Sequence, residues 1–268
     1  MNVARYFDRH ASAFDALYED DTGAIGWFNQ LFRRGLYERV HQTVRALQEL
    51  EAPSVLDVGC GSGRNSVVFV ESGARRVVGI DFADQMLKLA HEKARQHGVE
   101  DRCEFRKADF LTCRLAEQYD ASVALGVLDY IAEPVPFLKK MISLSTRKVV
   151  VSFPGMALIR APLRKLRYAL KGCPVYFYSR RSIRTLCLEA GLTDYRVLRC
   201  ASSGYILIGN LETSSLQRPG KEKSVMCRGP MTPATAAGKQ VWARLPVMCL
   251  PLNEGGSELL TRCTSSPW

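Results

Sequence analysis

The sequence predicts an α/β fold built on a doubly wound, seven-stranded sheet whose last strand is antiparallel. Apolar runs of strand length alternate with helical patterns along most of the 268 residues. This alternation is typical of parallel strands joined by crossover helices. The final two strand-like runs are joined only by Ala201 to Gly204. A connection that short makes a hairpin, so the last pair of strands must be antiparallel.

The individual elements follow from the spacing of apolar residues. Strands are expected near residues 54–58, 76–80, 103–107, 119–125, 147–153, 193–200 and 204–210, and helices near 64–72, 84–97, 133–143 and 182–190. Asp84 is expected to cap the second helix and Gly98 to end it. Right-handed crossovers would bring the carboxyl ends of the parallel strands to one edge of the sheet.

A glycine-rich turn follows the first strand, with the sequence Asp57-Val-Gly-Cys-Gly-Ser-Gly-Arg64. Its glycines allow positive φ and let the backbone approach a ligand closely. The pattern departs from the dinucleotide-binding motif, because Arg64 stands where the third glycine would be. Asp57 would also repel a pyrophosphate, whereas it would suit a cationic ligand. Both departures count against a dehydrogenase.

Two further carboxylates are expected at strand ends. Asp81 ends the second strand about 20 residues after the turn, the spacing at which an acid reaches a ribose hydroxyl pair. Asp109 follows the third strand. Each acid alone is as well explained by a helix cap or a turn. Three acids at three successive strand ends favour a ligand site.

In this order, the turn and the acids resemble the motifs of the class I S-adenosylmethionine-dependent methyltransferases, which have a Rossmann-like fold. The likeness covers residues of about 1 to 210 and is closest in kind to the small-molecule enzymes, loosely to the magnesium-protoporphyrin O-methyltransferases. It implies S-adenosylmethionine as methyl donor, without a metal. It also implies a donor-binding role for eleven residues: Asp57, Gly59, Cys60, Gly61, Gly63, Asp81, Phe82, Met86, Asp109, Phe110 and Leu125.

The resemblance implies transfer of a methyl group to an O or N atom of a small-molecule acceptor, of acidic or aromatic biosynthetic type. Two alternatives stay open: a non-catalytic module that binds S-adenosylmethionine, and methylation of a macromolecule. The residues from Leu125 to Tyr130 do not form the Asn/Asp-Pro-Pro-Tyr/Phe motif of nucleobase and glutamine methylation. Most of the rate can come from holding donor and acceptor in line, with proton removal adding to it.

No general base follows securely from the spacing. The catalytic candidates are His10 and Tyr130, and Tyr6, His41 and Asp129 are the alternatives. His10 is preferred among the histidines because it lies in an N-terminal segment that, in related enzymes, closes over donor and acceptor.

The chain is expected to have three parts: a helical cap over residues 1–50, the S-adenosylmethionine-binding domain over 51–210 and a disordered tail over 211–268. The tail contains half of the 12 prolines and shows neither helical nor strand periodicity.

Charge and cysteine content narrow the expected partners and location. The net charge is +10 and the pI about 9.3, with a basic excess that suggests an acidic carrier or an anionic membrane surface for residues 160–184. No nucleic acid is expected as a partner, because RNA-binding signatures and zinc knuckles are missing from the sequence.

By a loose analogy with the magnesium-protoporphyrin O-methyltransferases, Tyr176, Tyr178 and Arg180 would contact the acceptor. Nine cysteines without C-x-x-C spacing suggest that the protein is located in a reducing cytoplasm. No apolar run in the sequence is long enough to cross a bilayer.

Overall fold

The computed structural model describes residues 24–155, 175–200 and 204–211, with side chains described from Gly35 onward. The strands are β1 (Ser54–Val58), β2 (Arg76–Asp81), β3 (Cys103–Lys107), β4 (Tyr119–Ala124), β5 (Ser145–Phe153), β6 (Asp194–Arg199) and β7 (Tyr205–Asn210). The helices are α2 (Ala24–Gln48), α3 (Arg64–Glu71), α4 (Asp84–Gln96), α5 (Pro134–Leu144) and α7 (Arg180–Ala190). The expected strands and helices are all present, with ends that differ by at most two residues.

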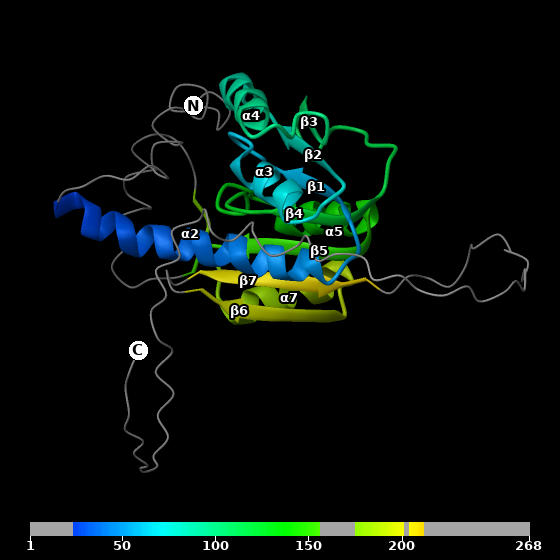
Figure 1. The fold of residues 1–268 in the computed structure, drawn as a ribbon. Coiled ribbons are helices and arrows are strands. Elements are labelled where there is room, and N and C mark those ends of the chain that lie inside the picture. The colour runs from blue at the N-terminus through cyan, green and yellow to red at the C-terminus, as the bar shows by residue number, and fades with distance from the viewer. Residues whose placement is uncertain (1–23, 156–174, 201–203, 212–268) are drawn as a thin grey trace, which may run out of the picture. The chain divides into compact units, whose positions relative to one another are not determined.

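The strands form one seven-stranded sheet in the order β3-β2-β1-β4-β5-β7-β6. β1 pairs in parallel with β2 and β4, and β4 pairs in parallel with β5. β7 is antiparallel to both of its neighbours and lies between β5 and β6 (Figure 1). The predicted doubly wound sheet with an antiparallel last strand is confirmed.

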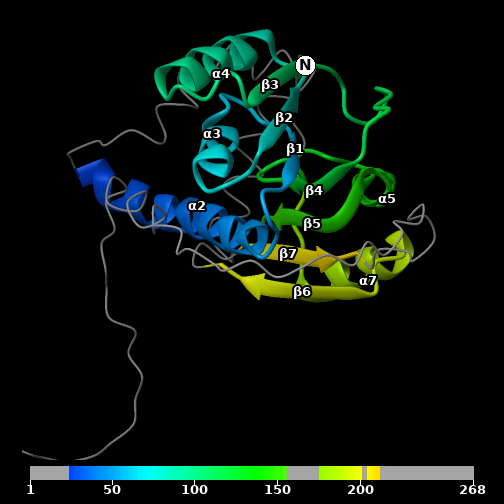
Figure 2. The ribbon, with the colours of Figure 1, turned by 45° about the vertical axis from the view of Figure 1, so that its right-hand side comes forward.

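Helices cover both faces of the sheet, as Figure 2 shows for α2, α3 and α4 on one side and α5 and α7 on the other. Side chains alternate along β1, so that Val55 packs in the core beneath α2 and α3, while Leu56 and Val58 pack in the core beneath α5 and α7. Every residue of β1 is buried. This burial on both faces explains why central strands read as nearly continuous apolar runs.

The predicted cap of the second helix is wrong in detail. Ala83 occupies the N-cap position of α4 and makes no side-chain cap bond. Asp84 lies instead in the first turn, where its carboxylate pairs with the Lys107 ammonium at 2.5 Å. Gly98 does follow the C-cap residue with a φ of 63°, so a left-handed glycine ends the helix as expected.

Helix α2 is tied to the sheet by its C-terminal end. Val44, Ala46, Leu47 and the following Leu50 are buried in the core shared with α3 and β5. Residues 1–23 and 212–268 lie outside the described residues, so the N-terminal cap and the C-terminal tail stay predictions. Within the described ranges, no helix is both long and apolar enough to cross a membrane.

Candidate active site

The glycine turn folds back onto the end of β2. The backbone N–H groups of Gly59 and Cys60 donate to the carbonyl oxygen of Ile80 at 2.7 and 3.1 Å. Gly59, Gly61 and Gly63 have φ values of 70°, 53° and 71°, a region that side chains with a Cβ rarely adopt. The turn therefore depends on glycine at all three positions.

The three glycines also face different surroundings. A Cβ at Gly59 would lie 2.5 Å from Cγ2 of Val127, and one at Gly63 would lie 2.9 Å from the Cα of Ala90. A Cβ at Gly61 would meet nothing within 4 Å. Close packing thus explains two of the glycines, whereas Gly61 borders the open space that a ligand could enter.

Asp81 joins this turn to the end of β2. Its Oδ2 accepts a hydrogen bond from the Gly61 N–H at 2.9 Å, and its Oδ1 accepts one from the Ala83 N–H at 2.9 Å. Because both oxygens are held by backbone N–H groups, the carboxylate has a fixed orientation beside the open side of the turn.

Asp57 lies behind the turn rather than in front of it. The residue is only 1% exposed, and its Oδ2 accepts a hydrogen bond from the Ser66 hydroxyl at 2.6 Å. Burial raises the pKa of this carboxyl to about 7, and the neighbouring charge of Asp81 raises it further, against the opposing effect of the Ser66 bond. The pair connects β1 to α3 and so supports the turn from the inside.

The Cys60 thiol also points away from the open side. A Cβ at Gly79 of β2 would lie 2.9 Å from the Cys60 sulfur and 2.7 Å from the Phe105 ring. Burial raises the pKa of the thiol well above its ordinary value. Only the backbone of Cys60 is thus placed to meet a ligand. Gly79 was missed by the sequence reasoning, although a glycine inside an apolar strand is a signal of close approach.

The predicted adenine side divides into exposed and buried residues. Phe82 is 37% exposed, whereas Met86 is buried. Asp109 is exposed, and its Oδ1 accepts a hydrogen bond from the Leu111 N–H at 2.9 Å. Phe110 is buried and meets the Phe137 ring of α5 edge to face, with 4.9 Å between the ring centroids.

The loop after β4 is anchored by distant segments. Gly126 N–H donates to the Ser152 hydroxyl at 2.8 Å, and the Tyr178 hydroxyl donates to the Leu128 carbonyl at 3.3 Å. The Tyr176 N–H donates to the backbone carbonyl of Asp129 at 2.8 Å. Val127 packs on Gly59, so this loop adjoins the glycine turn. We call residues 125–131 together with residues 175–178 the acceptor side.

The acceptor side contains one buried carboxylate beside phenol groups. Asp129 is 4% exposed. Burial raises the pKa of Tyr178 to about 12, and the charges of Asp129 and Tyr176 contribute in the same direction. Leu125 and Tyr130 are half-buried in the same loop. This arrangement supplies groups that could receive or orient a proton.

The structure does not bring all the predicted catalytic and acceptor-contacting residues together at the candidate site. His10 and Tyr6 lie outside the described residues, and His41 is exposed on α2. Arg180, predicted by analogy to meet the acceptor, donates from Nη2 to the Val197 carbonyl of β6 at 2.8 Å. In the described part of the chain, no three His, Cys, Asp or Glu side chains are grouped so as to hold a metal ion.

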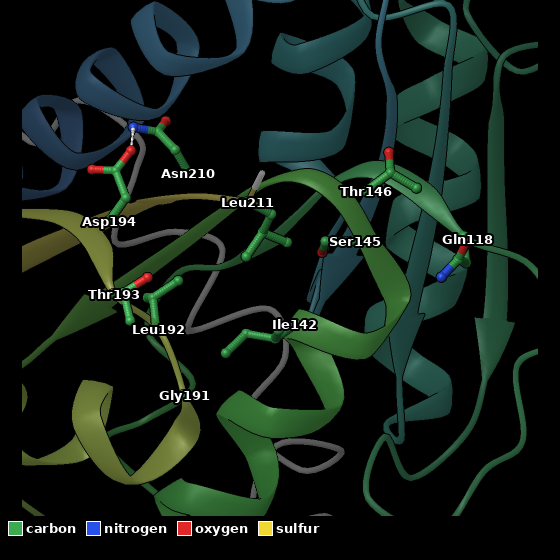
Figure 3. Close-up of a pocket in the computed structure, with 10 residues that line it drawn as sticks. All are labelled: Gln118, Ile142, Ser145, Thr146, Gly191, Leu192, Thr193, Asp194, Asn210 and Leu211. Carbon is green, nitrogen blue, oxygen red and sulfur yellow. Dashed lines mark hydrogen bonds between the residues drawn. The ribbon is translucent and has the colours of Figure 1, made fainter. Parts of the chain in front are cut away.

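An open hollow of about 430 Å³ lies at the other edge of the sheet (Figure 3). It is bordered by the beginnings of β5 and β6 and the end of β7, with Ser145, Asp194 and Asn210 among its lining residues. Figure 3 shows the Asp194 and Asn210 side chains meeting at its rim, where their hydrogen bond measures 2.9 Å. Since parallel strands present the glycine turn at their carboxyl ends, this hollow is separate from the candidate site.

Comparison with known proteins agrees with this geometry. Residues 50–163 match the family model described as a methyltransferase domain. The chain is 31% identical over 127 residues to a ubiquinone biosynthesis O-methyltransferase of Psychrobacter cryohalolentis, covering 46% of this chain and 48% of that protein. It is 44% identical over 54 residues to a ribosomal protein L11 methyltransferase of Alteromonas mediterranea, covering 20% and 18%. The chain thus spans about half, or less, of the length of these curated relatives.

A solved structure extends the likeness over a longer part of the chain. Magnesium protoporphyrin IX methyltransferase from Synechocystis PCC 6803, with SAH bound, superposes with a TM-score of 0.64 and 23% sequence identity. The match covers 78% of this chain and 98% of that one. The chain therefore has the fold of that methyltransferase structure, and residues 50–163 are similar to a methyltransferase domain.

Proposed function

We propose that this chain transfers a methyl group from S-adenosylmethionine to an O or N atom of a small-molecule acceptor. The observation that carries the proposal is the bond from the Gly61 N–H to Asp81, made beside the open side of the turn. The bond presents a carboxylate in a fixed orientation next to accessible backbone, as binding of a ribose hydroxyl pair requires.

In this proposal, Asp81 binds the ribose hydroxyls and the turn contributes its backbone at Gly59, Cys60, Gly61 and Gly63. Phe82 and Met86 lie near the adenosine, and Asp109 and Phe110 near the adenine. Asp57 supports the turn without touching the donor, because its buried carboxyl accepts a hydrogen bond from Ser66 and so holds the start of α3 against β1. Leu125 approaches the methionine portion.

The donor supplies an electrophilic methyl carbon, so the protein needs mainly to hold the acceptor in line with it. The acceptor's O or N lone pair forms the new bond as the carbon–sulfur bond breaks, and the electron pair of that bond stays on sulfur. The acceptor's proton leaves to a base, for which Tyr130 and His10 are our candidates. Packing of Val127 on Gly59 keeps the two halves of the site together.

The relatives support a small acceptor over a macromolecule. The matches to two ribosomal-protein enzymes cover 18% and 36% of their lengths, so most of each of those enzymes has no counterpart in the match. By contrast, the magnesium-protoporphyrin enzyme is matched over 98% of its chain. An acidic acceptor, a carrier or an anionic membrane surface would suit the basic segment 160–184, in which Arg180, Arg181 and Arg184 are exposed among the described residues. The cytoplasmic location expected from the cysteines remains part of this proposal.

Calorimetric titration of the full chain with S-adenosylmethionine and S-adenosylhomocysteine tests the donor site. We expect binding in the micromolar range and a loss of at least about tenfold in Asp81→Ala, since a charged hydrogen-bond acceptor is removed. Asp101→Ala is the matched control, because Asp101 is exposed in the turn before β3 at the opposite edge of the sheet. A folded chain that binds neither compound would refute the proposal.

Transfer itself is tested with S-adenosylmethionine carrying an isotopically labelled methyl group and a panel of phenols, carboxylic acids, porphyrins and amines. Label in one of these acceptors supports the small-molecule assignment. Binding without transfer to any of them would favour the non-catalytic alternative.

A further inference from the structure

Lys140 of α5 forms hydrogen bonds with the backbone of the turn that follows β3. Its ammonium Nζ donates to the backbone carbonyls of Leu111, at 3.3 Å, and of Cys113. The same Nζ lies 5.1 Å from the centroid of the Phe110 ring, over its face. One side chain therefore contacts three of the four residues from Phe110 to Cys113, although Lys140 lies 27 or more residues further along the chain.

The turn that Lys140 contacts also determines the orientation of Asp109. The Cys113 N–H donates to the Asp109 carbonyl at 2.9 Å, and the Leu111 N–H donates to the Asp109 Oδ1 at 2.9 Å. The direction of the Asp109 carboxylate is thus set by the conformation of residues 109–113. This segment belongs to the connection between β3 and β4, outside regular secondary structure.

Residues 109–113 form no regular secondary structure of their own, and they pack against helix α5. Phe137, one turn before Lys140, is 1% exposed and packs against Phe110 from below. A hydrogen bond from a charged donor is stronger than one from a neutral donor. The ammonium over an aromatic face adds a cation–π attraction. Together these contacts hold the turn against α5 at two points, one apolar and one charged.

We propose that Lys140 is a positioning residue that sets the purine specificity of the donor site. It holds residues 109–113 so that the Asp109 carboxylate accepts a hydrogen bond from the exocyclic amino group of adenine. A carboxylate in that position disfavours a base with a keto oxygen in place of the amino group, because two acceptors would then meet. The inference rests on the proposed donor site, in which Asp109 lies near the adenine, and goes beyond it by naming Lys140 as the residue that holds Asp109 in position.

The test compares S-adenosylhomocysteine with S-inosylhomocysteine, in which the adenine amino group is replaced by oxygen. Calorimetric dissociation constants are measured for the full-length wild type, Lys140→Met and Lys139→Met. Lys139 is the matched control, because it is the exposed neighbour on the same helix. We expect the wild type to prefer the adenine compound. In Lys140→Met this preference should fall about fivefold, by weaker binding of the adenine compound alone, while Lys139→Met keeps the wild-type ratio.

A uniform weakening of both compounds in Lys140→Met would show a merely structural role and overturn the inference, as would an unchanged ratio. Failure of the wild type to bind either compound would remove the proposed function and this inference with it. Binding by the wild type together with an unchanged ratio in the variant removes the inference alone. Should Lys140→Met lose its folded circular dichroism, Lys140→Gln, which keeps an N–H donor without the charge, is measured against the same criterion.

Discussion

The donor side of the site, formed by β1 to β3 and the glycine turn, is built differently from the acceptor side. The Gly61–Asp81 hydrogen bond joins residues 20 apart, from the turn to the end of the next strand along the chain. The Tyr178–Leu128 bond joins residues 50 apart, and the Gly126–Ser152 bond joins residues 26 apart. The donor side is therefore encoded in successive βα units of one half of the sheet, whereas the acceptor side depends on segments that meet only in the finished fold.

The largest expected effect concerns the buried carboxyl of the donor side. The folded-state pKa of Asp57 is raised to about 7 from an ordinary value of 3.8. Between about pH 4 and pH 7 the unfolded chain loses this proton and the folded chain keeps it, so the free energy of unfolding falls as pH rises. Replacing Asp57 by Asn removes this titration. We expect the stability of Asp57→Asn relative to wild type to rise by about 4 kcal/mol across that window and then level off.

Urea unfolding of both proteins at several pH values measures this difference. Asp120→Asn is a useful contrast, because the pKa of Asp120 is lowered: burial opposes the shift, but bonds from Ser54 and the charge of Arg75 outweigh it. Its relative stability should change with the opposite sign at low pH. A difference between Asp57→Asn and wild type that is independent of pH would contradict the prediction.

The next largest expected effect is a loss of folding stability when a methyl group is added at Gly63. Its φ of 71° is unfavourable for alanine, and the added Cβ would lie 2.9 Å from the Ala90 backbone. We expect Gly63→Ala to cost about 3 kcal/mol, the sum of left-handed strain and overpacking. Gly98→Ala shares the positive φ but has open space around the added Cβ, so it should cost about 1 kcal/mol. Equal losses in urea unfolding would mean that backbone strain alone decides the turn.

The smallest effect should be confined to the acceptor side. Tyr178→Phe removes the hydroxyl that donates to Leu128 and should cost about 1 kcal/mol, the usual net value of a hydrogen bond. Hydrogen exchange should quicken for amides of residues 126–131 and stay unchanged at Gly61. Tyr205→Phe, at a half-buried position on β7, is the control. Faster exchange in the glycine turn as well would erase the distinction between the two sides.

The sequence was most informative where local patterns decide the structure. Apolar periodicity located the seven described strands and the helices α3, α4, α5 and α7, because burial on a sheet face imposes a regular spacing. β5 begins earlier than expected because Ser145 pairs with Tyr119 of β4, and its buried hydroxyl donates to the Ser122 hydroxyl at 2.6 Å. A polar residue buried in this way interrupts the pattern without ending the strand. The sequence predicts Asp84 as a cap because it does not show that Lys107 lies beside it.

The candidate site was only partly predictable for the same reason. The glycine turn and Asp81 follow from adjacent motifs, but Ser66, Gly79, Val127 and Lys140 gain their significance from partners elsewhere in the chain. The sequence predicts that Gly59 and Gly63 let the backbone approach a ligand, and close packing against Val127 and Ala90 is a second reason for each glycine. The roles assigned to the binding residues stay predictions that titration can test.

The position of β7 has a consequence for how the protein is made. β7 is the last strand in the sequence, yet it fills the place between β5 and β6. β6 and β7 pair with each other as a hairpin, and β5 presents an open edge until β7 pairs with it. The sheet therefore closes only when this hairpin joins β5 through its second strand. A chain that stopped before residue 205 would have an exposed edge on β5 and a β6 strand without its hydrogen-bonded neighbour.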